Sequence, residues 1–479
     1  MMLSCRPFCI HKKTSMKKFY ILCLSALFLF PALESSYASP IDTVVAKQAA
    51  IAFCQRQRIL SNPQLVYTHS CDEQGTETPA FYVFNFNKGF VIISGSDVAY
   101  PVLGYSSESQ FDPGQIPDNM RAFLNEYARE IRVLEENNAP SKWQNAFVSQ
   151  PKDTLTGVIV GPLLTTKWSQ DTLYNDMCPA DPSGPNGHAV TGCVATAMAQ
   201  VIRYWAYPTI GQGEYGYEDN YEGAMEGMGN YGYLYVNFGN TTYDYAHMPD
   251  ILDETSTAEE VEAVATLIYH CGVSVNMMYG TQGSSAIGFM VAKALRNYFR
   301  YPSNVKTISR DNYTDQHWHI LVKHELDEHA PVLYGGSGEA GGHSFICDGY
   351  SDDNFYHINW GWEGRNDGYF KLELLNPAEY SFASGQNITI NVRAVPVNVP
   401  DYLNSSLRIY PNPAADQIRI QNSSAMSKTQ IFDVFGKLLQ STNLNDTSIS
   451  LNVSNLAPGT YILHIFDGQN VSMRKFVKR

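Results

Sequence analysis

The amino-acid sequence predicts the α+β fold class in a chain of several domains. Segments with apolar residues at helical spacing lie mainly in the first two thirds of the chain, ahead of a group of strand-like runs. Those later runs alternate apolar and polar side chains and are bounded by Gly, Asp or Asn, which is typical of antiparallel strands. The length of 479 residues also exceeds the usual size of one domain. Helices followed by an antiparallel sheet are therefore expected in the largest unit, with smaller units on either side.

Residues 1–38 have the pattern of a secretory signal peptide. A short basic region at residues 16–18 precedes an apolar stretch, and small residues before Ser39 suit cleavage after Ala38. The apolar stretch is shorter than the roughly 20 residues of a spanning helix, which disfavours a membrane anchor. The sequence therefore predicts export.

Residues 39–159 are expected to form a small α+β module. A short helix from Asp42 to about Phe53 is followed by FYVFNFNKGFVIIS, two alternating runs that predict a hairpin. A second helix is expected from Asp118 to about Asn137 because apolar residues recur there at helical spacing. The polar stretch after it predicts an exposed linker.

Residues 160–400 form the largest unit. Its first half is expected to hold a helix after Cys193 and helices near 258–271 and 286–298. A Gly/Tyr-rich section between them is interpreted as an ordered loop, since tyrosines bury large areas. The second half contains PVLYGG, HSFICDGY, NFYHINWGW and GYFKLELL, which predict strands.

Residues 404–479 follow a linker rich in Pro and Val. They contain alternating runs separated by Asn-Pro, Phe-Gly and Pro-Gly-Thr turns. The sequence predicts a separate β-sandwich-like domain.

The charge of the chain disfavours nucleic acid as a partner. Its net charge is −14, and affinity for phosphate backbones needs clustered Lys and Arg. Hydrophobic residues at 44% and charged residues at 17% are those of an ordinary folded protein.

Six of the nine cysteines lie beyond the leader. Cys54 and Cys71 lie in one segment and could form a disulfide, as exported chains often do. Cys271 and Cys347 stand in apolar contexts and are predicted to be buried core thiols.

Cys193 is the candidate nucleophile. It follows Gly192 and stands in the first turn of a predicted helix, where free backbone N–H groups and the positive helix end favour a thiolate. The same N–H groups could stabilise an oxyanion when the sulfur attacks a carbonyl. A lone buried cysteine is more often inert, so further residues must support this role.

His343 is the candidate acid/base partner. It follows two glycines that would let a substrate backbone come close, and Asn359 is expected on the neighbouring strand. Cys on a helix, His on one strand and Asn on the next, in that order, is the papain-type arrangement. His357 is expected to have a structural role.

The other histidines receive structural interpretations. His188 is expected to be a solvated loop residue. His317 and His319 are spaced like a metal pair, but no further ligand follows at useful spacing, so no metal and no cofactor are expected.

Four blocks resemble the streptopain family of papain-like cysteine peptidases, in its Bacteroidetes form. They are GHAVTGCVATAMAQVIRYWAYP, GVSVNMMYGTQGSSA, PVLYGGSGEAGGHSFICDGY and NFYHINWGWEGRNDGYFKL. The resemblance runs in order through residues 160–380 and implies the papain-like cysteine peptidase fold, with a helical half and an antiparallel β half. The segments FYVFNFNKGFVIISGS and YPVLGYS resemble that family's inhibitory propeptide.

The resemblance implies roles for individual residues. Cys193 would be the nucleophile and His343 the general base and acid, with Asn359 and Trp360 as orienting residues. Ser285 and Gly342 match positions that line the substrate cleft. This chain departs from the family at Gly335, where streptopain has a Gln, so an oxyanion donor from that side chain is missing.

The flanking segments also resemble known parts. Asn119 matches a propeptide segment that is inserted at the active site and displaces the catalytic His, and removal of the propeptide is expected near residues 150–160. The C-terminal domain, with YPNPA, its GTY turn and KFVKR, resembles the sorting domain of Bacteroidetes type IX secretion. That likeness implies passage to the cell exterior, with release or attachment to the outer surface.

The sequence thus predicts the secreted zymogen of a cysteine endopeptidase that cleaves proteins through a thioester. Its expected partners are protein and peptide substrates, its own propeptide as inhibitor and the type IX secretion machinery. The resemblance further implies an apolar residue two positions before the scissile bond. One alternative is a catalytically inactive surface-anchored binding or adhesion protein on a peptidase fold. Another is a thiol-dependent acyltransferase or bacteriocin-processing enzyme, which would share the catalytic residues.

Overall fold

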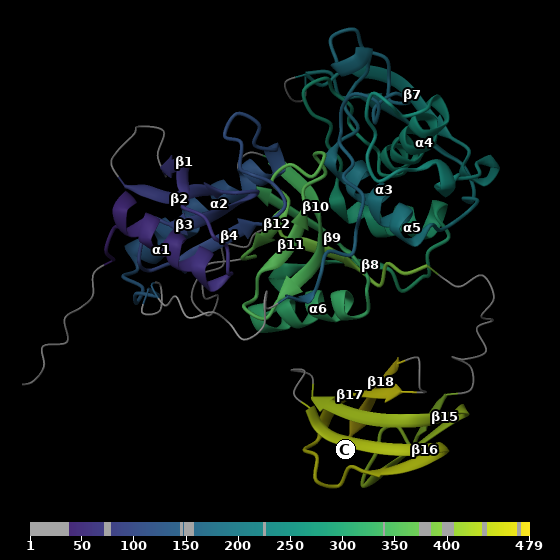
Figure 1. Cartoon of the computed structure of the whole chain (residues 1–479). Coiled ribbons are helices and arrows are strands. Elements are labelled where there is room, and N and C mark those ends of the chain that lie inside the picture. Colours follow the sequence, from purple (N-terminus) through teal and green to yellow (C-terminus); the bar gives the residue numbers. More distant parts are fainter. Residues whose placement is uncertain are drawn as a thin grey trace, which may run out of the picture. The chain divides into compact units, whose positions relative to one another are not determined.

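The computed structural model describes most of the chain from residue 38 to the C-terminus (Figure 1). The described residues are 38–70, 78–143, 147, 158–223, 227–338, 341–372, 385–394, 407–433, 438–466 and 471–479. The predicted leader, apart from its last residue, and most of the predicted linker lie outside them. Within the described part of the chain, none of the helices is both long and apolar enough to span a membrane.

The N-terminal module, described over residues 38–143, combines helices with antiparallel strands. The predicted hairpin is confirmed, since β2 pairs with β3 and Asn87 takes a positive φ of 27° in the turn. The Asp42 carboxylate caps the first helix by accepting from two backbone N–H groups. The second helix begins after Pro117 as predicted. The elements are α1 Thr43–Arg56, β1 Gln64–Ser70, β2 Pro79–Phe86, β3 Gly89–Ser94, β4 Val102–Ser106 and α2 Asp118–Glu136.

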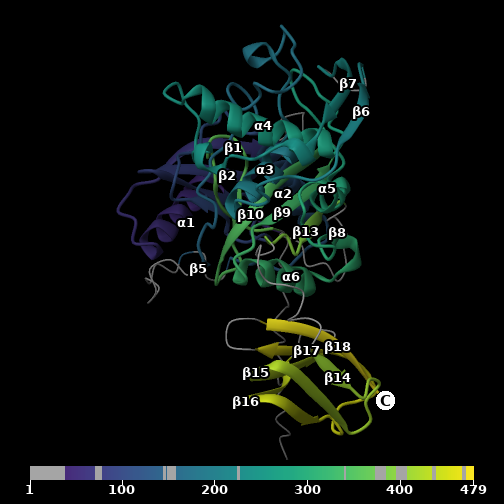
Figure 2. The same ribbon diagram turned by 90° about the vertical axis from the view of Figure 1, so that its right-hand side faces the viewer.

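The central unit, described from residue 158 to residue 394, begins with a helical half. There α3 (Cys193–Trp205) packs against α4 (Ala258–Ser274), and α4 also contacts α5 (Val291–Tyr298); the three helices can be found in Figures 1 and 2. Residues 194–202 of α3 are all buried because this helix is apolar or small on every face. α4 begins with a capping box between Thr257 and Glu260.

Three parts of this unit differ from the prediction. The Gly/Tyr-rich section is not simply a loop, because β6 (Tyr215–Asn220) and β7 (Asn230–Val236) form a two-stranded antiparallel sheet. The helix expected from residue 286 starts later, after a 3₁₀ turn at Gly288–Met290. The helix α6 (Asp315–Asp327) was not predicted, although its Thr314 cap is a regular start signal. The other 3₁₀ turns are Pro185–Gly187, Phe238–Asn240, Tyr245–His247 and Arg310–Asn312.

One sheet runs through the N-terminal module and the central unit. Among the described residues it has eleven strands in the order β1-β2-β3-β4-β12-β11-β10-β9-β13-β8, with β5 paired to β10. The module joins the unit where Gly104 and Tyr105 of β4 pair with Phe370 and Tyr369 of β12. The strands of the unit are β5 Val158–Val160, β8 Lys306–Ser309, β9 Val332–Gly338, β10 Gly341–Ser351, β11 Tyr356–Asn359, β12 Gly368–Phe370 and β13 Asn387–Ile390.

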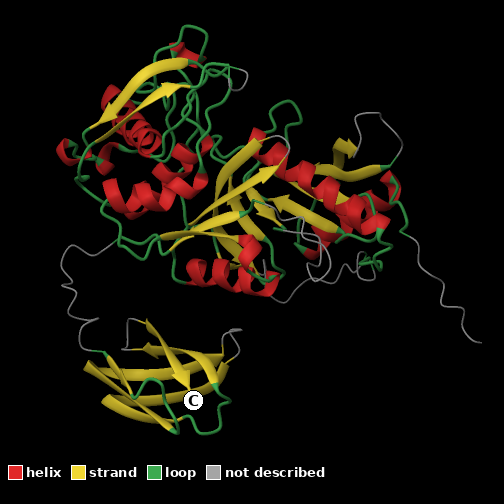
Figure 3. Cartoon of the chain, turned by 180° about the vertical axis from the view of Figure 1, so that it is seen from behind, coloured by secondary structure: helices red, strands yellow, loops and turns green. Residues whose placement is uncertain are grey.

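The two parts also share an apolar core. Phe90 of the module contacts Phe370 of the central unit, and Phe123 on α2 packs edge-on against Trp360. The Tyr127 hydroxyl donates to the carbonyl groups of Leu103 and Lys371, one on each part. Figure 3 shows the strands of the sheet in yellow and the helices that cover it in red. The module is therefore built onto the central unit by strand pairing and by buried aromatic contacts.

The C-terminal domain is β-rich, as predicted. Its strands form one five-stranded sheet in the described residues, in the order β14-β15-β17-β18 with β16 paired to β15. Alternate residues of the strands, such as Ile418 and Ile420, are buried in a core of its own. The strands are β14 Arg408–Tyr410, β15 Gln417–Asp433, β16 Leu438–Asn452, β17 Gly459–Phe466 and β18 Val471–Lys478.

Candidate active site

Gly192 fixes the position of Cys193 at the start of α3. Its φ is +84°, a conformation that glycine adopts freely. A Cβ on Gly192 would lie 2.8 Å from the Met277 sulfur and 3.0 Å from the Ser284 carbonyl oxygen, so there is no room for a side chain. The cysteine therefore takes the first position of the helix, as predicted.

The strand that carries His343 lies directly against this cysteine. Ser344, the next residue on β10, donates its backbone N–H to the Cys193 sulfur at 3.3 Å. His343 itself is opposite Gly336 in the pairing of β10 with β9. Gly342 precedes it on β10, opposite Ser337. The structure thus brings the helix with the thiol and the strand with the histidine together.

Two opposing influences act on the pKa of the Cys193 thiol. Burial raises the pKa of Cys193, and the Asp118 carboxylate of α2 raises it further. The backbone N–H groups of Ser344, Val194 and Cys193 itself oppose this change. The helix end acts in the predicted direction, but burial of the thiol outweighs it.

Asn119 of α2 is inserted beside the candidate site. Its side chain is buried, and its amide N–H group donates to the carbonyl oxygens of Trp360 at 2.6 Å and Ser344 at 3.3 Å. Asn119, which the family resemblance had indicated, therefore links the backbone next to His343 to the turn at Trp360. This contact holds the module on the site.

Trp360 is buried in aromatic surroundings. Its ring packs against Phe345 at 5.1 Å and Phe370 at 5.3 Å between centroids. Its indole N–H donates to the Asn366 carbonyl, and its backbone N–H donates to the Asp367 carboxylate at 2.9 Å. These contacts fix the turn that follows β11.

The Asn359 amide connects β11 to α3. Its nitrogen donates to the Thr166 carbonyl at 2.9 Å, and its oxygen accepts from the Gln200 amide and from the Gly361 N–H. In this structure the amide thus orients the backbone around Trp360 and the base of α3. A contact with the His343 ring in another state stays a prediction.

Ser285 lies in a loop that contacts the segment before the cysteine. Its backbone N–H and carbonyl are paired with those of Met278. The neighbouring Ser284 hydroxyl donates to the Val190 carbonyl at 2.6 Å, which ties this loop to the chain leading into α3.

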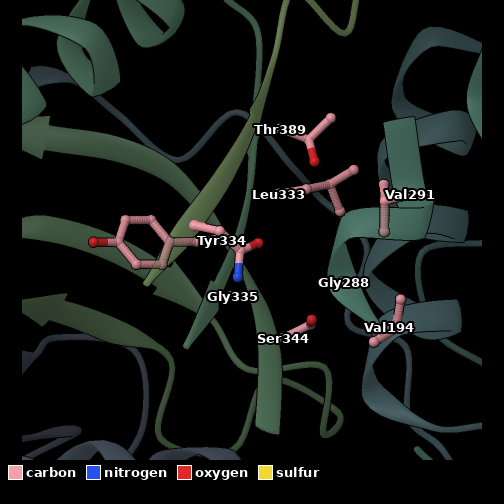
Figure 4. Close-up of a pocket in the computed structure, with 9 residues that line it drawn as sticks. Val194, Gly288, Val291, Leu333, Tyr334, Gly335, Ser344 and Thr389 are labelled. Carbon is pink, nitrogen blue, oxygen red and sulfur yellow. The ribbon is translucent and has the colours of Figure 1, made fainter. Parts of the chain in front are cut away.

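A small pocket, partly open to solvent, lies next to the cysteine (Figure 4). Val194 and Val291 stand on its helix side and Leu333 on its strand side, while the Tyr334 ring is turned away. Gly335 also lines the pocket. The missing side chain at this position does not leave a void, because a Cβ there would lie 3.0 Å from the amide atoms of Asn387.

Sequence reasoning missed a cluster of charged groups around His357. The ring is buried, with Nδ1 2.6 Å from the Asp348 carboxylate and Nε2 3.1 Å from Glu108 of the N-terminal module. Burial alone would lower the pKa of His357, but the two carboxylates raise it to about 10. The same histidine lowers the pKa of Glu108, with Lys167 nearby at 3.7 Å. No local pattern marks this contact, since the partners are 249 positions apart.

The remaining histidines and cysteines have structural positions. His188 Nδ1 lies 2.8 Å from the Cys178 carbonyl, so it is less solvated than predicted, and the His319 ring stacks on Tyr356. Cys54 is a buried free thiol with a pKa raised by burial to about 11, which does not support the suggested disulfide; Cys71 lies outside the described residues. The predicted core thiols Cys271 and Cys347 are fully buried, which confirms that prediction.

Comparison with known families divides the chain into three matched regions. Residues 38–131 match the Spi protease inhibitor family, residues 168–370 the peptidase C10 family, and residues 408–479 the secretion system C-terminal sorting domain. These regions correspond to the N-terminal module, most of the central unit and the C-terminal domain.

Individual relatives agree with these matches. The chain is 31% identical over 420 residues to thiol protease/hemagglutinin PrtT of Porphyromonas gingivalis, which covers 85% of this chain but only 46% of that relative. It is 32% identical to streptopain of Streptococcus pyogenes over 64% of this chain and 76% of the relative. Among solved structures, a prointerpain A fragment of Prevotella intermedia is 35% identical, with a TM-score of 0.58, and covers 70% of this chain and 100% of the fragment.

Three lines of observation now agree: the helix and strand that meet at Cys193, the N-terminal module seated over them, and the matched relatives. The chain therefore belongs to the peptidase C10 family, the streptopain family of secreted cysteine peptidases that are made as zymogens.

Proposed function

We propose that this chain is the latent form of an endopeptidase in which Cys193 is the nucleophile and His343 the general base and acid. The observation that carries the proposal is the 3.3 Å contact between the Ser344 N–H and the Cys193 sulfur, which holds the strand of His343 against the thiol. Asn119 of the propeptide supports a latent state, since it is bound to the backbone on both sides of this site.

The reaction follows from these groups once the propeptide has left. His343 takes the proton of Cys193, and the thiolate attacks the carbonyl carbon of the peptide bond. The backbone N–H groups at the start of α3 and of Ser344 can stabilise the oxyanion that forms. The carbon–nitrogen bond then breaks while the His343 imidazolium gives its proton to the leaving amine. Water, deprotonated by His343, hydrolyses the thioester and restores the thiol.

Asn359 and Trp360 act as positioning residues in this proposal. The contacts of Asn359 with Gln200 and Gly361 support such a role, because they set the backbone at Trp360, which packs against the strand of His343. Ser285 and Gly342 would line the substrate cleft.

The propeptide is expected to be removed near residues 150–160. β5, at Val158–Val160, pairs with β10 of the peptidase, which supports a cut ahead of this strand so that it stays with the enzyme. The sorting domain indicates secretion and association with the cell surface. We further infer that the type IX secretion machinery is its partner and that proteins and peptides outside the cell are the substrates.

The test is the intact mass of the zymogen, lacking leader and tail, under reducing conditions with and without a thiol-directed epoxide inhibitor. Loss of the propeptide mass, blocked by one adduct on Cys193, is the expected result. A Cys193→Ala variant should neither mature nor hydrolyse casein, while Cys178→Ala, which removes another buried thiol, should do both. Wild-type hydrolysis by Cys193→Ala would refute the assignment.

A further inference from the structure

The pocket beside Cys193 has two kinds of wall. Its helix side is apolar, with Val194 next to the nucleophile and Val291 at the start of α5, and Leu333 of β9 faces them (Figure 4). β13 adds two polar residues to the lining: Thr389, which is paired with Leu333, and Asn387, which is paired with Gly335. A substrate side chain in this pocket would therefore meet both apolar surface and polar groups.

Asn387 is the polar group available for a substrate. The Thr389 hydroxyl is buried and already bonded to the Thr307 hydroxyl at 2.8 Å. The Asn387 side chain is half-buried, and one of its amide hydrogens donates to the Gly385 carbonyl at 3.2 Å. An asparagine amide has a second hydrogen to donate and an oxygen that accepts. These remaining groups can bind a ligand in the pocket.

Gly335 and Gly288 leave the space that the Asn387 amide occupies. Asn387 is paired with Gly335 across β13 and β9, and a Cβ on Gly335 would approach both amide atoms to 3.0 Å. On the helix side, a Cβ on Gly288 would lie 3.4 Å from the amide oxygen. The amide therefore reaches from one wall of the pocket to the other. A side chain at Gly335 would push it aside, so the glycine and the asparagine act together.

We propose that Asn387 is a specificity-determining residue, whose amide selects substrate side chains with an apolar stem and a hydrogen-bonding end, such as Thr or Gln. This inference rests on the proposed function, because it assigns the pocket to the substrate of Cys193. It refines the expectation of an apolar preference, since an apolar side chain of the same size leaves the remaining hydrogen-bonding groups of the half-buried Asn387 amide without a partner.

The experiment uses the enzyme matured from the full chain and peptides in which each of the three residues before the scissile bond is varied in turn. At the position that enters the pocket, Thr should be preferred over the equally large Val by about tenfold in kcat/KM. Asn387→Leu keeps the size of the side chain and should abolish this preference. Asn387→Asp keeps its shape and adds a charge, so it should raise kcat/KM for Lys at the same position by about tenfold or more.

The matched control is Asn304→Asp, which places the same charge on an exposed turn and should leave the profile unchanged. Folding of each variant is checked by thermal unfolding and by epoxide titration of Cys193. If the folded variants keep hydrolysing peptides with the wild-type profile at all three positions, the inference on Asn387 is wrong while the proposed function stands. If peptides are hydrolysed without a titratable Cys193, the proposed function itself fails.

Discussion

The thiol of Cys193 is subject to two opposing influences in the zymogen. The first turn of α3 and the Ser344 N–H favour the charged form, whereas burial and the Asp118 carboxylate favour the neutral one. Since the carboxylate and the covering helix both belong to the propeptide, the same segment blocks the site and disfavours the reactive form of the nucleophile. Latency thus has a chemical component besides the steric one.

This balance predicts the pH dependence of alkylation at Cys193. The pKa of Cys193 is raised in the zymogen. The rate of its reaction with iodoacetamide should therefore reach half its maximum at a pH above the usual thiol pKa of about 8.5. Asp118→Asn should move the midpoint to lower pH, and the mature enzyme should have a lower midpoint still. Adduct formation on Cys193, followed by mass spectrometry across pH, checks this. The control is Asp112→Asn, which removes another, exposed carboxylate of the propeptide. Equal pH midpoints in Asp118→Asn and the wild type would count against the role of Asp118.

Residue types and order predict Cys193 and His343 as partners, because a thiol at a helix start and a histidine after two glycines are local patterns. The structure brings their helix and strand together, and the catalytic roles stay predictions. The resemblance added Trp360 and Asn119. The contacts of Asn387 and Glu108 could not be predicted, since each is made with a distant strand and no local pattern encodes it. The effect of the helix end on the Cys193 pKa was predicted in the right direction, but the burial that outweighs it could not be seen in the sequence.

At the scale of elements, the junction between β4 and β12 decides how the propeptide is held. Gly104 faces the Phe370 ring so closely that a Cβ would lie 2.6 Å from it. The absence of a side chain lets the two strands and the aromatic residues behind them pack together.

We expect Gly104→Val to loosen the propeptide without altering the mature enzyme, in which this residue is absent. The added side chain would collide with Phe370, and overpacking of this kind costs about 1–3 kcal/mol of stability. The zymogen should therefore unfold its propeptide at lower temperature and mature faster, which thermal scans and time courses of intact mass measure. Gly114→Val, in an exposed turn, should mature at the wild-type rate. Unchanged maturation of Gly104→Val would mean that this junction does not limit activation.

Long elements with clear periodicity were predicted well, such as α2, α3 and the hairpin of β2 and β3. The prediction failed for β6 and β7, where glycines and tyrosines hide the alternation of a hairpin. It also missed α6, whose His317 and His319 were noted for their metal-like spacing and not as part of a capped helix. The joining of two units in one sheet was not predictable, because strand order depends on contacts between distant segments.

At the scale of the whole molecule, Glu108 and His357 form a charged contact between propeptide and enzyme. The lowered pKa of Glu108 means that its carboxylate favours docking above its free value of about 4.3, and that this contribution is lost as the pH falls through the lowered value. Against the effect of burial, the pKa of His357 is raised to about 10 mainly by Asp348 of the same unit and in part by Glu108 of the propeptide. The part due to Glu108 favours docking while the ring is charged and is lost as the pH rises through 10. Docking should therefore be firmest in the acidic to neutral range above about pH 5 and should weaken as the pH rises toward 10.

Glu108→Gln should remove the part of the pH dependence of docking that is due to protonation of Glu108 at low pH. At pH 6 the cut propeptide should leave the enzyme about tenfold faster than in the wild type, because a hydrogen bond to a charged group is lost. Below pH 4 the two proteins should differ little. The measurement is the dissociation rate of the propeptide from a Cys193→Ala zymogen cut in the linker by an added protease. Glu126→Gln, which removes a propeptide carboxylate paired with Arg129, should behave as the wild type; an equal effect of both variants would contradict a specific role for Glu108.

The sheet that runs from β4 into β12 has a consequence for the time course of activation. Cutting the linker removes a covalent connection, but it leaves the strand pairing, the aromatic packing and the Asn119 contacts in place. The cut chain is then a reversible complex whose lifetime is set by dissociation. Activity should lag behind cleavage, and the lag should shorten on dilution, when released propeptide no longer rebinds. A secreted enzyme of this design would stay latent where it is concentrated at the cell surface and become active as it spreads into the surroundings.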